Sequence, residues 1–299
     1  MGLSSAMHTV QISHRHHFVP KFLLRQWYAA DHLGFWLYFR DGTDKLRCRR
    51  KPAKSVAFMD DLYSFRPDFP SLGSLAKPDA LETEYFAAID DEAAAVHRKL
   101  LVDDRPPLTQ AERRAWARFI NSLLERSPAR ISELESMAAS DPQIQGLLRH
   151  PRAIMLRDGR PKADLSAMLR NGLLRALRDF IDKEEDVAYL SSMRWVNFDI
   201  ASKNEQFLTG DMPLVVNAGA GPSPIEMLTI AISPRRLLIM YREHEMVDQD
   251  LLVKAAVLHS ILLTKQTQRH LISSCRLVDG RGLNYARIAS GLATVPSLG

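Results

Sequence analysis

The chain has 299 residues, of which 46% are hydrophobic and 25% are charged, a balance that is ordinary for a soluble globular protein. No apolar run approaches the roughly 20 residues that a membrane-spanning helix needs, which excludes a membrane protein. The two cysteines are too few for a disulfide framework, and the N-terminus lacks the features of a signal peptide, so we expect a cytoplasmic protein. The net charge of +5 permits a phosphate-bearing partner without requiring one.

The N-terminal part is expected to contain a short helix and a hairpin. Pro20 suits a first helical turn, and the apolar residues that follow it recur at helical spacing. Two β-rich runs, 34–40 and 46–50, then flank the sequence DGTD, and Asp-Gly between such runs predicts a hairpin. Residues 51–65 are predicted to be a mostly irregular connection, and the Pro/Ser/Gly-rich stretch 67–79 a loop.

The middle of the chain, residues 79–185, is predicted to be essentially all helical. It opens with a long amphipathic stretch that begins at Asp79. A second helix is expected after Thr109, because Glu112 three residues later completes a capping box. Pro128 is placed to interrupt or restart that helix, and further helical segments follow it.

The C-terminal part returns to β-structure. Short β-rich runs separated by turn residues occur at 194–200, 206–211, 213–217, 226–232 and 237–242. Residues 248–266 are predicted to form a helix, and 270–275 to return as a strand.

The order of these elements predicts one α+β domain. Helices segregated between groups of strands suit this class better than alternating βαβ units do. We expect the helical middle to pack against an antiparallel or mixed sheet built from the N-terminal hairpin and the C-terminal strands. The domain is expected to span residues 8–299, with residues 1–7 as an N-terminal tail or a cloning scar.

Three motifs resemble those of a known family. They are HHFVPKFLLRQW at 16–27, DDLYSF at 60–65 and QFLTGDMPLVV at 206–216. Their combination resembles the DUF4238 family, a domain of unknown function whose members carry HHxVPxFxLRxF early and a (T/S)-(S/G)-D-x-P turn late. The motif positions in this chain are His16, His17, Val19, Pro20, Phe22, Arg25, Thr209, Asp211 and Pro213, with Leu62 and Tyr63 as a looser match. The resemblance implies a soluble bacterial protein and carries over no cofactor or reaction.

The histidine cluster at the N-terminus is a candidate for chemistry, because histidine titrates near neutral pH and is the commonest metal ligand. In an extended segment His14 and His16 point to one face and His17 to the other, so one metal ion cannot bind all three. Alternatively, one imidazole hydrogen-bonds a backbone carbonyl in the core and the others face water. The spacing excludes an HNH nuclease finger, and Arg25 and His32 match the ribonuclease spacing of HEPN proteins only loosely.

Asp211 is the best acidic partner for these histidines. It follows a predicted buried strand, and Pro213 prevents further strand pairing. Acids at strand ends are rigidly held yet reachable, which suits a general base or a metal ligand. An Asx-turn, in which the aspartate caps its own backbone, explains the residue equally well.

Two arginines of the predicted second helix, Arg114 and Arg118, share one face. Arginine binds phosphate in a bidentate manner, so this face is a candidate phosphate site. Surface ion pairs with Glu112 or Glu125 would also account for both arginines.

The most coherent chemistry for these residues is hydrolysis of a phosphodiester in RNA or DNA. His16 or His17 would act as a general base or a metal ligand, Asp211 would bind the metal or orient the histidine, and Arg25 would stabilise developing negative charge. In this hypothesis His17 and Asp211 hold a divalent metal. A toxin or anti-phage role would be consistent with such an enzyme.

The rival hypothesis is a non-enzymatic binding module in which both motifs are structural. His17 would then bond to the TGDMP turn, and the helical middle would bind a partner. A hydrolase or transferase acting on a small nucleotide is a third possibility and shares the proposed site. The hypotheses differ in exposure, since an enzyme needs these side chains at a cleft, whereas a structural motif buries them with their nitrogens bonded.

Overall fold

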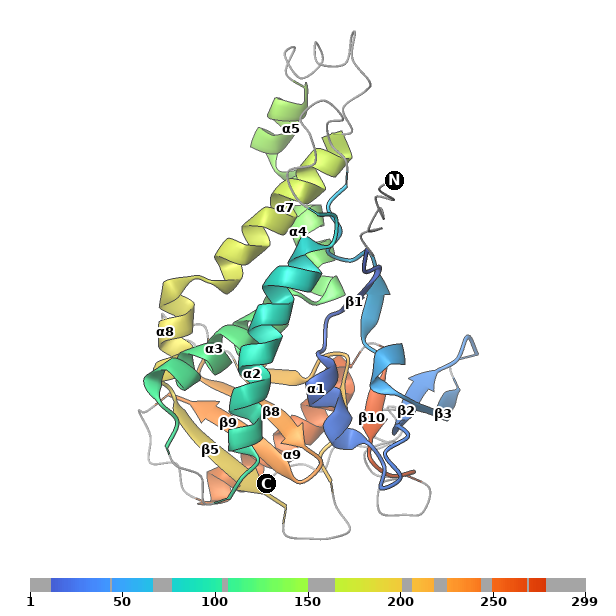
Figure 1. Cartoon of the computed structure of the whole chain (residues 1–299), viewed down its shortest axis with the longest axis vertical. Coiled ribbons are helices and arrows are strands. Elements are labelled where there is room, and N and C mark those ends of the chain that lie inside the picture. Colours follow the sequence, from blue (N-terminus) through green and yellow to red (C-terminus); the bar gives the residue numbers. More distant parts are fainter. Residues whose placement is uncertain are drawn as a thin grey trace, which may run out of the picture.

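The fold is described from a computed structural model that defines residues 12–43, 45–66, 77–103, 107–149, 165–200, 206–217, 225–242, 249–267 and 269–277. The expected tail at 1–7 and residues 67–76 of the expected loop lie outside these ranges. Figure 1 shows long helices in the upper and left part of the molecule and small sheets below them. In the part of the chain so defined, no helix is long and apolar enough to cross a membrane.

The N-terminal strands form two of the three sheets. A two-stranded sheet pairs β1 (Arg15–His17) with β4 (Phe58–Asp60). A four-stranded antiparallel sheet has the order β3-β2-β10-β6; its strands are β2 (Phe35–Arg40), β3 (Leu46–Lys51), β6 (Thr209–Gly210) and β10 (Leu271–Ser273). The predicted hairpin is therefore confirmed, and it recruits two strands from the far end of the chain.

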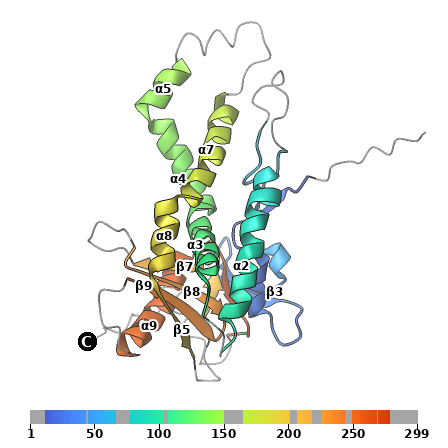
Figure 2. The ribbon, with the colours of Figure 1, turned by 60° about the vertical axis from the view of Figure 1, so that its left-hand side comes forward.

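The remaining C-terminal strands form a second four-stranded antiparallel sheet of their own. Its order is β5-β9-β8-β7, with β5 (Arg194–Asp199), β7 (Leu214–Asn217), β8 (Met227–Ser233) and β9 (Arg236–Tyr241). β9 is buried along its whole length, which explains its continuous run of apolar residues. Figure 2 shows α2 (Ala87–Leu100), α3 (Gln110–Glu125) and α8 (Glu184–Ser192) on one side of this sheet and α9 (Gln249–Gln266) on the other.

The other helices lie near the N-terminal motif or extend away from the sheets. They are α1 (Lys21–Leu24), the 3₁₀ turns η1 (Arg25–Trp27) and η2 (Ala53–Ser55), the π-helical turn η3 (Leu81–Phe86), α4 (Pro128–Ser140), α5 (Pro142–Arg149) and α7 (Leu165–Ile181). The predicted capping box begins α3, since the Thr109 hydroxyl accepts from the Glu112 N–H and the Glu112 carboxylate accepts from the Thr109 N–H. A new helix, α4, begins at Pro128 directly after the N-cap residue Ser127, as expected from the position of the proline.

One large apolar core joins the helices to the sheets and includes the N-terminal motif. Phe18, Leu23 and Trp27 are buried in it, and the indole N–H of Trp27 donates to the carbonyl of Phe207, 2.9 Å away. The predicted α+β class is therefore confirmed. The connection at 51–65 is more regular than expected, because β4 finds its partner strand β1 more than forty residues earlier in the chain.

Candidate functional site

The strand β1 presents the two histidines of the N-terminal motif to opposite faces. His16 lies opposite Met59 of β4 and His17 opposite Phe58, in the alternation expected of an extended segment. His14 precedes the strand, is exposed, and pairs with the exposed Asp61 at 2.9 Å. The three histidines are therefore separate features and do not form a cluster.

His16 is fully buried, and both of its ring nitrogens are hydrogen-bonded. Its Nδ1 accepts from the backbone N–H of Tyr63 at 2.8 Å, so Nε2 carries the proton and donates to the carbonyl of Ser13 at 2.9 Å. The imidazole also stacks on the Tyr63 ring, with centroids 5.5 Å apart. Burial lowers its pKa, which favours the neutral ring. This arrangement joins the first motif to the DDLYSF motif and leaves neither ring nitrogen of His16 available for chemistry.

His17 is mostly buried on the other face, beside Phe58. Burial first, and then the positive charge of Lys21, lower the pKa of its imidazole to about 4. Its backbone N–H donates to the Glu82 carboxylate at 3.1 Å, whereas its Nε2 is buried with no hydrogen-bond partner in the structure described. The partner of His17 is therefore the π-helical turn and not the TGDMP turn.

A buried group of charges lies beside His17. Arg126 is fully buried at the end of α3 and donates from Nη1 to Asp90 at 2.9 Å, and its backbone carbonyl accepts from the Tyr63 hydroxyl at 2.5 Å. Burial is the main reason that the pKa of the Glu82 carboxyl is raised to about 7. The hydrogen bond from the His17 N–H and the charge of Arg126 oppose this shift, and the charge of Asp90 contributes to it. Burial also raises the pKa of Asp90. The guanidinium of Arg126 thus hydrogen-bonds Asp90 and also interacts with the Glu82 carboxyl through its charge.

Replacing Glu82 with glutamine is expected to stabilise the protein in a pH-dependent way. The folded-state pKa of about 7 lies above the unfolded value. The carboxyl therefore contributes most stability at low pH, and that contribution is lost as the pH rises from the unfolded pKa to about 7. The gain of Glu82→Gln over wild type should accordingly grow between pH 5 and pH 8. Urea midpoints measured at both values test this, and an equal gain at both would contradict it.

Asp211 lies in a tight turn that is hydrogen-bonded to the connection between α9 and β10. Its carboxylate accepts from the backbone N–H of Arg269 at 2.8 Å, and its own N–H donates to the carbonyl of His270. A Cβ at Gly210 would lie 2.7 Å from that carbonyl oxygen, so the close approach requires glycine. The side-chain amide of Gln266 donates to the Met212 carbonyl at 2.9 Å. Asp211 thus accepts a hydrogen bond from a backbone segment that is distant in the sequence.

The structure brings Asp211 near the N-terminal motif without opening a site there. Phe18, Asp211 and Arg269 border a space of ≈ 10 Å³, which is about the volume that one water needs. Among the residues that the structure describes, no group of three or more His, Cys, Asp or Glu side chains could hold a metal ion. The catalytic and metal-binding roles of His16, His17 and Asp211 stay a prediction that this geometry does not favour.

The predicted arginines are scattered over the surface. Arg25 is exposed at the junction of α1 and η1. Arg114 forms an ion pair with Glu184, and Arg118 forms a two-bond pair with Asp182 at 2.5 and 3.2 Å. The expectation of surface ion pairs is correct in kind, but the partners come from the α7–α8 region and not from α3 itself.

The largest opening among the pockets we describe lies between η3 and α7 and has a volume of ≈ 640 Å³. We call it the basic cleft, and its charged and aromatic lining is Phe65, Lys77, Tyr85, Arg118, Arg175 and Arg178, together with Glu84. α7 is fixed beside the segment 62–66 because Asn171 exchanges two hydrogen bonds with the backbone of Arg66 and Arg170 donates to the Leu62 carbonyl.

Four cations therefore face the cleft, and only Arg118 belongs to the predicted phosphate site. Sequence analysis missed Arg175 and Arg178, although their spacing of three places both on one face of a helix. Lys77 is remote from them in sequence, and only the fold brings it to the same cleft.

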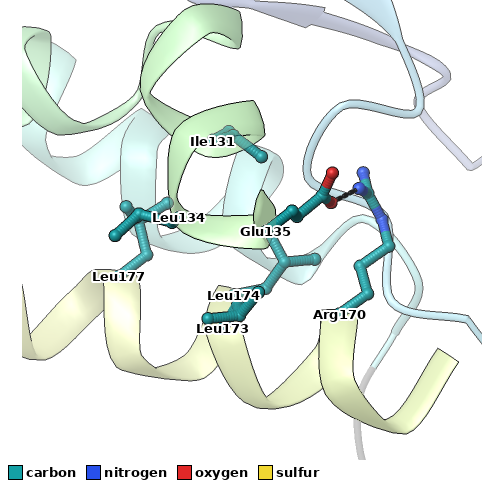
Figure 3. Close-up of a pocket in the computed structure, with 7 residues that line it drawn as sticks. All are labelled: Ile131, Leu134, Glu135, Arg170, Leu173, Leu174 and Leu177. Atoms are coloured by element: carbon teal, nitrogen blue, oxygen red, sulfur yellow. Dashed lines mark hydrogen bonds and ion pairs between the residues drawn. The ribbon is translucent and has the colours of Figure 1, made fainter. Parts of the chain in front are cut away.

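A second pocket, between α4 and α7, is too small to hold a ligand. Leucines of both helices, with Ile131, fill the groove, and the ion pair of Glu135 with Arg170 closes one end (Figure 3). The remaining space is ≈ 10 Å³. This contact therefore serves to pack the two helices together.

The comparisons with known proteins identify a family and no closer relative. No curated protein and no solved structure matches the chain. The model of the family described as "Protein of unknown function (DUF4238)" matches residues 15–257, which is most of the chain and includes all three motifs. The chain therefore belongs to the DUF4238 family.

Proposed function

We propose that this protein binds a small phosphate-bearing ligand, of the size of a nucleotide, in the basic cleft. The observation that carries the proposal is that Arg175 and Arg178 line the cleft, contact aromatic rings and form no ion pair among the described residues. Arg175 lies over the ring of Phe65, 5.7 Å from its centroid, and Arg178 over that of Tyr85 at 4.8 Å. Neither arginine has a carboxylate partner within the described ranges.

This arrangement leaves the arginines prepared to bind an anion. Stacking on an aromatic face holds the plane of a guanidinium group while its N–H edge stays available. That edge matches the geometry of phosphate oxygens, and two such groups one helical turn apart can hold adjacent oxygens or adjacent phosphates. Two arginines that lie over aromatic rings therefore line the cleft before any ligand arrives.

The charge around these arginines also favours an anion. Lys77 pairs with Glu84 of the cleft lining at 3.1 Å, and Arg118 pairs with Asp182, so these two carboxylates are already neutralised. Arg175 and Arg178 then supply the excess positive charge. The volume of ≈ 640 Å³ falls within the range of small-molecule sites, which favours a nucleotide over a long polymer.

The motifs are structural in this proposal. His16 and Asp211 are buried, and each bonds a backbone group from a distant part of the chain. The rival phosphodiesterase hypothesis needs the same side chains at a surface that a substrate can reach. A nuclease assay of the wild-type protein on RNA and DNA, with and without a chelator, tests that rival directly.

The double variant Arg175→Gln and Arg178→Gln is expected to weaken binding of a fluorescent ATP analogue by about tenfold or more, because each glutamine removes a charge-assisted pair of hydrogen bonds. Arg98→Gln is the matched control, since Arg98 is exposed on α2 and does not line the cleft. Fluorescence anisotropy gives Kd, and circular dichroism verifies folding.

Three outcomes would overturn the proposal. The first is no measurable binding to the wild-type protein, and the second is equal binding to the double variant. The third is binding of a single-stranded oligonucleotide without binding of the ATP analogue, which would assign the cleft to a polymer.

A further inference from the structure

The positive charge of the chain is concentrated in one short segment. Residues 45–54 contain six lysines and arginines and no aspartate or glutamate. The whole chain has a net charge of +5, so the other residues together carry a slight excess of negative charge. A run of cations as dense as this is typical of segments that bind nucleic acids or other polyanions. The segment is therefore a candidate binding surface outside the basic cleft.

Most of this segment forms β3, which is an edge strand. β3 lies at the end of its sheet and pairs there with β2 alone, and the first four of its six residues are exposed. Figure 1 shows it at the right edge of the view. The exposed Arg276, which follows β10, lies near the same edge, over Trp36 of β2. We call these cations the basic edge; they are Arg47, Arg49, Arg50, Lys51 and Arg276.

The cations of β3 follow an extended line. Side chains alternate along a strand, so Arg47, Arg49 and Lys51 share one face of the sheet and Arg50 lies on the other. Two residues of a strand span ~7 Å, which is comparable with the repeat of the phosphates along an extended single strand of nucleic acid. The three cations can therefore meet successive phosphates.

The basic edge also carries flat groups. Arg49 lies over the ring of Phe39, 4.5 Å from its centroid. Arg50 and Arg276 both lie over the ring of Trp36, at 6.0 and 5.7 Å. Guanidinium planes and aromatic rings are the two kinds of protein surface on which unpaired nucleobases stack. Positive charge and stacking surfaces thus occur together on one exposed edge.

Protection of the edge strand does not account for this arrangement. Charged side chains on an edge strand hinder its pairing with another sheet, which explains some charge on β3. That role needs no contact between guanidinium groups and rings, and no cation from beyond β10. Arg47 pairs with Asp41 and Arg50 with Asp31, whereas the other three cations have no carboxylate partner in the part of the chain that the structure describes.

We propose that the basic edge binds a single-stranded nucleic acid that runs along β3. Its phosphates meet the row of Arg47, Arg49 and Lys51, and its bases stack against the arginines that cover Phe39 and Trp36. This surface is formed by β2, β3 and the residue after β10, none of which lines the basic cleft. The proposal is therefore independent of the nucleotide site.

Binding of labelled single strands to the full chain tests the proposal. Fluorescence anisotropy with oligo-dT and oligo-U of about 15 nucleotides, at several salt concentrations, gives Kd and its salt dependence. The triple variant Arg49→Gln, Lys51→Gln and Arg276→Gln is expected to raise Kd by about tenfold or more. It should also lower the slope of log Kd against log salt concentration by about 2, because three phosphate contacts are lost.

Two control variants separate this surface from general charge and from the cleft. The matched control changes three exposed cations on other elements to glutamine: Arg98 on α2, Lys183 before α8 and Lys254 on α9. It has the same net charge as the triple variant and should bind like the wild type. The cleft variant Arg175→Gln with Arg178→Gln should do so as well. Circular dichroism verifies that each variant folds.

The double variant Arg49→Lys with Arg276→Lys tests the stacking contacts. Lysine keeps the charge and lacks the flat guanidinium group, so Kd should rise while the salt slope stays the same. An unchanged Kd would overturn the stacking role.

The proposal as a whole would be overturned by a wild-type protein that binds neither strand, or by equal Kd values for the triple variant and its matched control. Equally tight binding of poly-glutamate or of anionic lipid vesicles would overturn it too, since either would indicate a partner without bases.

Discussion

Replacing Arg126 with leucine is expected to lower the free energy of unfolding by about 3–5 kcal/mol, since it removes the positive partner of a buried ion pair. Arg126 is fully buried, and its guanidinium bonds Asp90 while it also acts on the nearby Glu82. Burial already raises the pKa values of Glu82 and Asp90. Without Arg126, these two carboxyls would be buried with no positive charge to offset the cost of ionising them. Urea unfolding followed by circular dichroism measures the loss.

The matched control for this prediction is Arg114→Leu on the same helix. Arg114 also forms an ion pair, with Glu184, but both side chains face water. Solvent screens such a pair, so the urea midpoint should change little. A second comparison is the double variant Arg126→Leu with Asp90→Leu, which removes both charges and should recover much of the lost stability. Equal losses for Arg126→Leu and Arg114→Leu would contradict the importance that we assign to burial.

The variant His16→Ala is expected to lose about 2–4 kcal/mol of stability, from the cavity that it leaves and from the buried Tyr63 N–H that it deprives of an acceptor. The ring of His16 also stacks on Tyr63, so this ring contact between the first motif and the DDLYSF motif is lost as well. His14→Ala is the control, because His14 is exposed and only two positions away. Thermal unfolding of both variants tests the prediction.

The same pair of variants separates the structural hypothesis from the catalytic one. A catalytic His16 would give a variant that keeps its unfolding midpoint and loses an activity. A structural His16 gives a variant that is destabilised, and any function should then return at low temperature, where enough of the protein is folded. A His16→Ala protein as stable as the wild type would contradict the structural role.

The local patterns of the sequence predicted most elements and the fold class. The Thr109–Glu112 capping box, the DGTD hairpin and the apolar run of β9 depend on residues that are neighbours in the chain. Such patterns can be read within a few residues, because the hydrogen bonds of a helix or a β-hairpin connect positions that are near one another in the chain. The three family motifs could also be recognised from the sequence alone, and the family match confirms that recognition.

Only the tertiary structure decided what those motif residues contact. Whether His16 faces a cleft or the core depends on Tyr63, 47 residues away, and the role of Asp211 depends on Arg269 at a separation of 58. The basic cleft likewise exists because the fold brings Lys77 beside Arg175 and Arg178. Burial and pairing of a polar side chain are properties of the packed chain, and no local periodicity encodes them. The sequence by itself thus determined which residues could carry chemistry, and packing determined which of them reach solvent.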